Sequence, residues 1–167
     1  MKDENIVLIG MPGCGKSTLG VLLAKLLCKD FADVDLLIQK RIGMPLQQYI
    51  DENGVDAFLE AEADALDALD LSNTVIATGG SAPLTARGAK RLAALGKIVY
   101  LSLPFSEIEK RITNAATRGI AMRAGETLLD VYNTRCPIYA ALADLTFTPE
   151  SSDIASTALA LSAGLKK

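Results

Sequence analysis

Histidine is absent from the 167-residue sequence. Its absence excludes the usual serine and cysteine triads, in which an imidazole accepts the proton of the nucleophile. It also excludes zinc sites built on histidine and the metalloprotease motif HExxH. If the protein is an enzyme, its general base must therefore be a carboxylate, a lysine, a tyrosine or a water molecule.

Strong charge bias and long apolar runs are missing as well. The net charge is −3 and no strongly basic block occurs, so the sequence predicts no nucleic-acid partner. The chain starts with the polar stretch 1–5, and no apolar stretch approaches the length of a membrane span. We therefore expect neither a signal peptide nor a membrane-spanning segment.

Cysteine is scarce, with three residues at Cys14, Cys28 and Cys136. Their odd number and the lack of metal-ligand spacing are typical of proteins of the reducing cytoplasm, which is the location we predict. The sequence leaves two interpretations of Cys14 open. It is either a redox-sensitive thiol or, more simply, a small residue within a loop.

What the sequence does contain is a regular alternation of apolar strands and helical stretches. Half of the residues are hydrophobic and 22% are charged, as in a globular protein large enough to bury a full core. Strands are predicted at 6–9, 31–35, 74–78, 97–101 and 145–148. Helical stretches are predicted at about 19–28, 36–42, 45–53, 55–71, from 83 onward, 105–115, 126–142 and 153–165. This order predicts one α/β domain over 1–167, with a parallel sheet and ligands at the carboxyl ends of the strands.

A glycine-rich segment joins the first strand to the first helix. Residues 10–18 read Gly-Met-Pro-Gly-Cys-Gly-Lys-Ser-Thr and match G-x-x-x-x-G-K-[ST] at every fixed position. Backbone N–H groups of such a loop point into one concavity beside the positive end of the helix, where a polyphosphate binds. Lys16 would contact the outer phosphates, and the Ser17 hydroxyl would contact Mg²⁺. The sequence therefore predicts a nucleoside triphosphate site; the alternative is a turn that only caps the helix.

Further short motifs follow in a fixed order. They are Asp33-Val34-Asp35, Phe58 to Glu62, Gly79-Gly80, Arg118 and Arg135-Cys136-Pro137-Ile138-Tyr139. Together with residues 10–18, this order resembles the shikimate kinase family over nearly the whole chain. The resemblance implies a three-layer P-loop kinase sandwich with a five-stranded parallel sheet, a substrate-binding region at about 33–62 and a flexible lid at about 115–125. It also implies ATP-dependent phosphorylation of a hydroxyl group of shikimate with Mg²⁺ as cofactor.

The resemblance assigns roles to single residues. The nucleotide would be bound by the loop and by an arginine against the adenine, namely Gly10, Met11, Pro12, Gly13, Cys14, Gly15, Lys16, Ser17, Thr18 and Arg111. Mg²⁺ would be held by Ser17 and, through water, by Asp33. The catalytic groups would be Lys16, Asp35, which orients or deprotonates the hydroxyl, and Arg118, which reaches the transferring phosphate from the lid. The acceptor would be bound by Asp35, Leu59, Gly79, Gly80, Ser81 and Arg135.

Three positions depart from the family pattern. Where the family has Phe-Arg-x-x-Glu, with the arginine paired to the acceptor carboxylate, this sequence has Leu59. Ser81 replaces the last residue of a triple glycine, and Gly119 replaces a proline after the lid arginine. Loss of one charge-assisted hydrogen bond would weaken carboxylate binding by roughly 10- to 150-fold. Shikimate is the expected acceptor. A different or smaller hydroxylated metabolite such as homoserine is the alternative, its carboxylate pairing with Arg135 and its ammonium group with Asp35 or another acid.

Each of these residues also has a purely structural interpretation. Asp33 and Asp35 could cap a turn or a helix, and Gly79-Gly80 could form an ordinary turn. Arg135 could lie on a helix surface, like most arginines. Glu62 belongs to an acidic stretch expected to be mostly solvated, although its equivalent in the family steadies the neighbouring arginine.

Two other functional classes are less well supported. The first is a nucleotide-dependent binding or switch protein. A GTPase of this class would carry Asn-Lys-x-Asp, which the sequence lacks. A mechanical ATPase would have an apolar strand ending in Asp-Glu, whereas the strand at 74–78 runs into Gly79. A dinucleotide oxidoreductase is disfavoured because Thr18 stands where the third glycine of its motif belongs. We expect a monomer that acts on a small molecule, although the sequence leaves an oligomer open.

Overall fold

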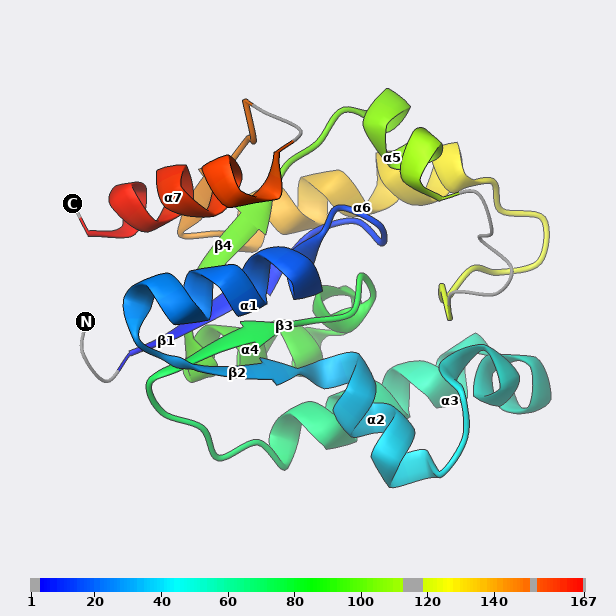
Figure 1. Cartoon of the computed structure of the whole chain (residues 1–167). Helices are drawn as coiled ribbons and strands as arrows, with labels where there is room; N and C mark the ends of the chain where they lie inside the picture. Colours follow the sequence, from blue (N-terminus) through cyan, green and yellow to red (C-terminus); the bar gives the residue numbers. More distant parts are fainter. Residues whose placement is uncertain (1–3, 113–118, 151–152, 167) are drawn as a thin grey trace.

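The computed structural model describes residues 4–112, 119–150 and 153–166 and contains one five-stranded parallel sheet (Figure 1). The strands are β1 (Asn5–Ile9), β2 (Asp30–Asp33), β3 (Thr74–Ala77), β4 (Gly96–Leu101) and β5 (Leu145–Phe147). Their order in the sheet is β2-β3-β1-β4-β5, so β1 and the glycine-rich loop that follows it occupy the centre. The predicted parallel α/β sheet is confirmed.

Helices cover both faces of this sheet. They are α1 (Lys16–Leu27), α2 (Val34–Ile42), α3 (Leu46–Asp67), the 3-10 helix η1 (Ala82–Leu84), α4 (Ala86–Leu95), α5 (Phe105–Arg111), α6 (Leu128–Leu142) and α7 (Ile154–Leu165). In Figure 1, α1 and α7 lie side by side over one face, and α4 lies over the opposite face. The arrangement is the three-layer sandwich that the family resemblance implies.

The central strands are buried on both faces. Val7 and Ile9 of β1 have no exposed surface, and parallel pairing places Val7 opposite Ile76 on one side and Ile98 on the other. A strand covered by helices on both faces has no solvated side to carry polar residues. This explains why β1 and β3 are near-continuous apolar runs in the sequence.

Asn5 is a buried polar residue at the amino end of β1. Its Nδ2 donates hydrogen bonds to the carbonyl oxygens of Leu71, at 2.6 Å, and Leu95, at 2.8 Å. Its Oδ1 accepts a hydrogen bond from the N–H of Thr74 at 2.9 Å. These three bonds tie β1 to the segments that lead into β3 and β4, a role that sequence analysis missed.

The boundary between β2 and α2 differs from the prediction. The predicted strand runs to Asp35, but β2 ends at Asp33, whose Oδ1 accepts hydrogen bonds from the N–H groups of Asp35 and Leu36. Asp33 is therefore the N-cap of α2, and Asp35 lies in the first helical turn. Competition from this cap ends the strand two residues early.

Other helix boundaries shift for similar local reasons. The helix predicted from 126 begins at Leu128, because Thr127 and Asp130 form a reciprocal capping box. Pro83 opens the short helix η1 rather than a long helix, and Thr85 then caps α4. The helix predicted over 105–115 ends early, at Arg111, because the backbone of Ile112 leaves helical geometry with φ −100° and ψ 77°; residues 113–118 lie outside the described part of the chain.

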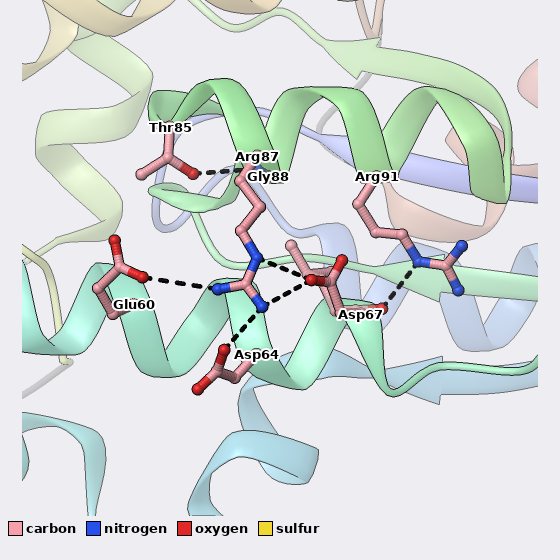
Figure 2. Close-up of polar contacts among 8 residues, drawn as sticks. Glu60, Asp64, Asp67, Thr85, Arg87, Gly88 and Arg91 are labelled. Atoms are coloured by element: carbon pink, nitrogen blue, oxygen red, sulfur yellow. Dashed lines mark hydrogen bonds and ion pairs between the residues drawn. The ribbon is translucent and has the colours of Figure 1, made fainter.

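Helix α3 is kinked and clamped to α4. At Gly54 its backbone leaves helical geometry, with φ 85° and ψ 168°, which corresponds to the predicted break between two helices. Figure 2 shows Arg87 of α4 reaching three acidic residues of α3. Its guanidinium nitrogens lie 3.5 Å from Glu60, 2.7 Å from Asp64 and 2.6 Å from Asp67. Part of the acidic face that was expected to be solvated therefore forms an ion-pair network, which we call the α3–α4 clamp.

Candidate active site

The segment 10–18 forms a tight loop between β1 and α1. Gly13 and Gly15 have φ values of 77° and 97°, which side-chain-bearing residues rarely adopt. A Cβ atom at Gly13 would lie 2.8 Å from Cγ1 of Ile112, so close packing also demands glycine there. The loop therefore presents backbone N–H groups at the N-terminus of α1, as an anion site requires.

Lys16 is buried and crosses the inside of this loop. Its Nζ donates hydrogen bonds to the carbonyl oxygens of Gly10 and Met11, each at 2.9 Å, and lies 3.7 Å from Sγ of Cys14. The ammonium group is held beside the loop amides, where the outer phosphates of a nucleotide would bind. Cys14 is itself buried and carries a free thiol.

Ser17 and Asp33 meet beside the loop. Ser17 Oγ donates a 2.6 Å hydrogen bond to Oδ2 of Asp33, while the other carboxylate oxygen of Asp33 caps α2. The capping interpretation of Asp33 is therefore confirmed, whereas its role toward Mg²⁺ stays a prediction. Among the described residues no group of three or more histidine, cysteine, aspartate or glutamate side chains could hold a metal ion. A hydroxyl and one carboxylate suit Mg²⁺ that takes its other ligands from phosphate and water.

Asp35 lies at the edge of the pocket in the first turn of α2. The pKa of its carboxyl is raised, chiefly because burial disfavours the charged form; Lys16 opposes this shift and Asp33 adds to it. A carboxyl with a raised pKa is suited to accept a proton near neutral pH. Asp35 thus has the position and the electrostatic environment of a general base.

The turn after β3 forms the opposite wall of the pocket. Gly79 lies against two carboxyl groups, because a Cβ atom there would lie 2.6 Å from Oε1 of Glu62 and 2.8 Å from Oδ1 of Asp35. Ser81 Oγ donates a 2.7 Å hydrogen bond to Oε2 of Glu62. Tyr139 donates a 2.5 Å hydrogen bond to the carbonyl oxygen of Gly80. The turn is therefore held by side chains from α3 and α6.

Glu62 departs from its sequence interpretation. Within a stretch expected to be solvated, its side chain is almost completely buried, with 1% of the residue exposed. Helical spacing carries the signal that was missed: Phe58, four residues earlier, is buried too, so the two share the inner face of α3. Phe58 also lines the pocket, as sequence analysis did not predict.

Arg135 is buried in α6 and does not lie on a helix surface. One guanidinium nitrogen donates a hydrogen bond to the carbonyl oxygen of Ala121. The segment 119–126 is thereby joined to α6, and it also contacts α3, because the N–H of Gly119 donates to Oε1 of Gln47 at 3.1 Å. The described part of the predicted lid closes one side of the pocket.

The remaining predicted site residues differ in placement. Arg111, at the end of α5, donates a 3.3 Å hydrogen bond from Nη1 to the carbonyl oxygen of Cys14, beside the loop. Leu59 is half buried and does not belong to the described residues that line the pocket, so its predicted contact with the acceptor stays a prediction. Arg118 and the rest of the lid over 115–118 lie outside the described residues.

One pocket of about 660 Å³ brings these groups together. It is lined by Pro12, Gly13, Gly15, Lys16, Ser17, Thr18, Asp35, Phe58, Thr78, Gly79, Gly80, Ser81, Arg111, Gly119, Ile120, Ala121 and Arg135. The pocket opens at the carboxyl ends of β1, β2 and β3, as expected for a parallel α/β sheet. Its phosphate loop, partly buried acid and buried arginine can hold a polyphosphate, a hydroxyl and a carboxylate side by side.

Comparison with known proteins shows the family to which the chain belongs. The family model described as shikimate kinase matches residues 12–163. The chain belongs to the shikimate kinase family. A shikimate kinase of Clostridium botulinum is 39% identical over 140 residues, which cover 81% of this chain and 82% of that protein. One from Nitratidesulfovibrio vulgaris is 36% identical over 141 residues, covering 81% of each.

Solved structures agree with this family assignment. A shikimate kinase from Acinetobacter baumannii in complex with shikimate superposes with a TM-score of 0.89 and 28% identity, over 98% of this chain and 93% of that one. The enzyme from Aquifex aeolicus gives 0.81 and 27%, over 97% and 96%. As a shikimate kinase family member, the chain is an ATP-dependent kinase. Within its described residues, no helix has the length and apolar character needed to cross a membrane.

Proposed function

We propose that this protein transfers the terminal phosphoryl group of ATP to a hydroxyl group of shikimate. The observation that supports this most directly is the joint placement of Lys16, Asp35 and Arg135 around one pocket of about 660 Å³. Lys16 suits the phosphates of ATP, the partly buried carboxyl of Asp35 suits the hydroxyl of the acceptor, and the guanidinium of Arg135 suits the acceptor carboxylate. The high structural similarity to an enzyme solved with shikimate supports the same acceptor.

The nucleotide side of the pocket fits ATP with Mg²⁺. The loop amides and Lys16 would hold the phosphates, and the Arg111 guanidinium, beside the loop at Cys14, would contact the base or ribose. Ser17 and Asp33 would hold Mg²⁺, which neutralises charge on the phosphates when bound.

On the acceptor side, this chain supplies orientation and charge. The Arg135 guanidinium would bind the carboxylate, and the carbonyl of Ala121 fixes its side chain. Asp35 would accept the hydroxyl proton as the acceptor oxygen bonds to the terminal phosphorus and the bridging P–O bond of ATP breaks, releasing ADP. Phosphoryl transfer depends mainly on such positioning and charge neutralisation. Arg118 would add charge from the lid, a role carried over from the family motif.

Homoserine is the second candidate acceptor. The observation that favours it is the single guanidinium, Arg135, among the described residues that line the acceptor side, since Arg111 lies against the nucleotide loop. One arginine matches a small acceptor whose carboxylate and ammonium groups pair with Arg135 and Asp35. Shikimate would have to bind its carboxylate with one charged partner fewer than the family pattern supplies.

An acceptor panel tests both candidates. The purified protein is assayed for ADP release and for phosphorylated product with Mg-ATP and either shikimate, homoserine or no acceptor. We expect shikimate 3-phosphate, loss of turnover in excess EDTA, and a fall in kcat of about a thousandfold for Lys16→Met. Exposed Lys25→Met is the matched control and should retain wild-type rates. Phosphorylation of homoserine in place of shikimate would reassign the acceptor, and turnover of neither would refute the proposal.

A further inference from the structure

The carboxyl group of Glu62 is buried behind the acceptor side of the pocket, and Leu59 stands where the family has the arginine that its equivalent steadies. The residue is 1% exposed, and its Oε1 has no hydrogen-bond partner among the described residues. Buried polar atoms without a partner are uncommon and costly, above all on an ionised group. The surroundings of Glu62 therefore need an explanation beyond packing.

Two contacts connect this carboxyl to the turn that faces the acceptor. Oε2 accepts the 2.7 Å hydrogen bond from Ser81, and Oε1 lies against Gly79, 2.6 Å from the position that a Cβ atom would take. Gly79 and Ser81 both line the pocket, whereas Glu62 does not. Glu62 can thus affect the acceptor only through this turn and through its electric field.

The charges around Glu62 favour its uncharged form. Burial is the largest effect and raises the pKa of the carboxyl to about 8; the hydrogen bond from Ser81 opposes this, and the charge of Asp35 in α2 adds to it. Arg135 from α6 and Lys16 from the loop lower the pKa, but they do not offset burial. At neutral pH most molecules therefore carry a proton on Glu62.

We propose that Glu62 is a positioning residue that works as an uncharged carboxylic acid. Its bond with Ser81 fixes the Gly79–Ser81 turn, and its lack of charge leaves Arg135 available to the acceptor carboxylate. An ionised Glu62 would attract Arg135 and repel Asp35, the two groups that the acceptor needs. The role rests on the proposed function, because it concerns the acceptor side of the same reaction.

The test compares acceptor kinetics at several pH values for the wild type, Glu62→Gln and Ser81→Ala. It uses whichever acceptor the wild type phosphorylates. For the wild type we expect the acceptor KM to rise about tenfold between pH 7 and pH 9, as Glu62 ionises. Glu62→Gln keeps an uncharged side chain of the same shape, so its acceptor KM at pH 7 should lie within about threefold of the wild type and stay flat to pH 9. Ser81→Ala should raise the acceptor KM about fivefold at pH 7. The KM for ATP should change less than twofold in all of them.

Glu60→Gln, on the exposed face of the same helix, is the matched control and should follow the wild-type pH profile. Equal pH profiles for the wild type and Glu62→Gln would overturn the proposal, as would a large loss of activity in Glu62→Gln at pH 7, since Glu62 would then work as an anion. If Ser81→Ala fails to fold, the Glu62→Gln profile still decides. A wild type that phosphorylates no acceptor would refute the proposed function. An active wild type whose pH profile equals that of Glu62→Gln would refute only the role of Glu62.

Discussion

The two ends of the sheet differ in how completely their buried polar side chains are hydrogen-bonded. At the amino end, Asn5 is 5% exposed, and three hydrogen bonds of 2.6 to 2.9 Å satisfy its amide. Near the carboxyl end, Glu62 is still more buried, yet one of its oxygens has no partner among the described residues. Two deeply buried polar side chains therefore differ in that all hydrogen-bonding atoms of one have partners, whereas one oxygen of the other has none among the described residues.

This difference indicates that the end of the sheet around Asn5 serves stability, whereas the end around Glu62 serves the reaction; we call them the structural end and the chemical end. A neutral amide with all of its partners stabilises the junction of β1 with the segments before β3 and β4. An acid with a missing partner costs stability, and proteins retain such groups mostly where chemistry uses them. Variants at the two ends should therefore affect different measurements, and each of the following predictions tests that separation.

The largest effect on stability is expected for Asn5→Ala. The substitution leaves the N–H of Thr74 and the carbonyl oxygens of Leu71 and Leu95 without their side-chain partner. We expect a loss of about 4 kcal/mol in the free energy of unfolding, measured by urea denaturation, with kcat and both KM values unchanged. Asn53→Ala, which removes one hydrogen bond at an exposed site, is the control and should cost far less. Altered kinetics in a folded Asn5→Ala protein would show that the two ends are coupled.

The second prediction concerns the pH dependence of stability. The pKa of Glu62 is raised from 4.5 in an unfolded chain to about 8 in the folded state, so between these values the native protein binds a proton that the unfolded chain has lost. The stability that Glu62 contributes is complete below pH 4.5 and is lost as the pH rises towards 8. Relative to the wild type, Glu62→Gln should therefore gain about 3 to 4 kcal/mol between pH 5 and pH 8.

Urea denaturation of both proteins at several pH values provides the measurement for this second prediction. The acids whose pKa values are lowered, such as Asp56 and Asp130, change charge below pH 4 and do not contribute in this range. A difference between wild type and Glu62→Gln that stays constant from pH 5 to pH 8 would mean that Glu62 is ionised throughout. The contrast between the two ends of the sheet would then be one of geometry alone.

The sequence predicts the nucleotide half of the site far better than the acceptor half. The phosphate loop is contiguous, so a local pattern specifies Lys16 and Ser17 without knowledge of the fold. The acceptor half joins α2, α3, the turn after β3 and α6, which meet only after folding. Asp35 and Arg135 were found through family resemblance, whereas the burial of Glu62 was missed because its acidic neighbours hid the periodicity of its helix face. Asn5 has no local signal, since its three partners lie 66 to 90 residues away along the chain.

The smallest effect is expected at the α3–α4 clamp, which belongs to neither end of the sheet. Arg87 contacts Glu60, Asp64 and Asp67, and hydrogen bonds to Asp64 and Asp67 raise its pKa, but the groups are exposed to solvent, where water and salt screen their attraction (Figure 2). We expect Arg87→Ala to lower the melting temperature slightly at low salt and not at all in 1 M NaCl, with unchanged kinetics. Arg123→Ala, which removes a single exposed pair with Asp56, serves as the comparison and should have a still smaller effect. A higher acceptor KM in Arg87→Ala would instead mean that the clamp must hold α3 in place for Glu62 to position the turn. Contacts on the outer surface of α3 would then contribute to acceptor binding.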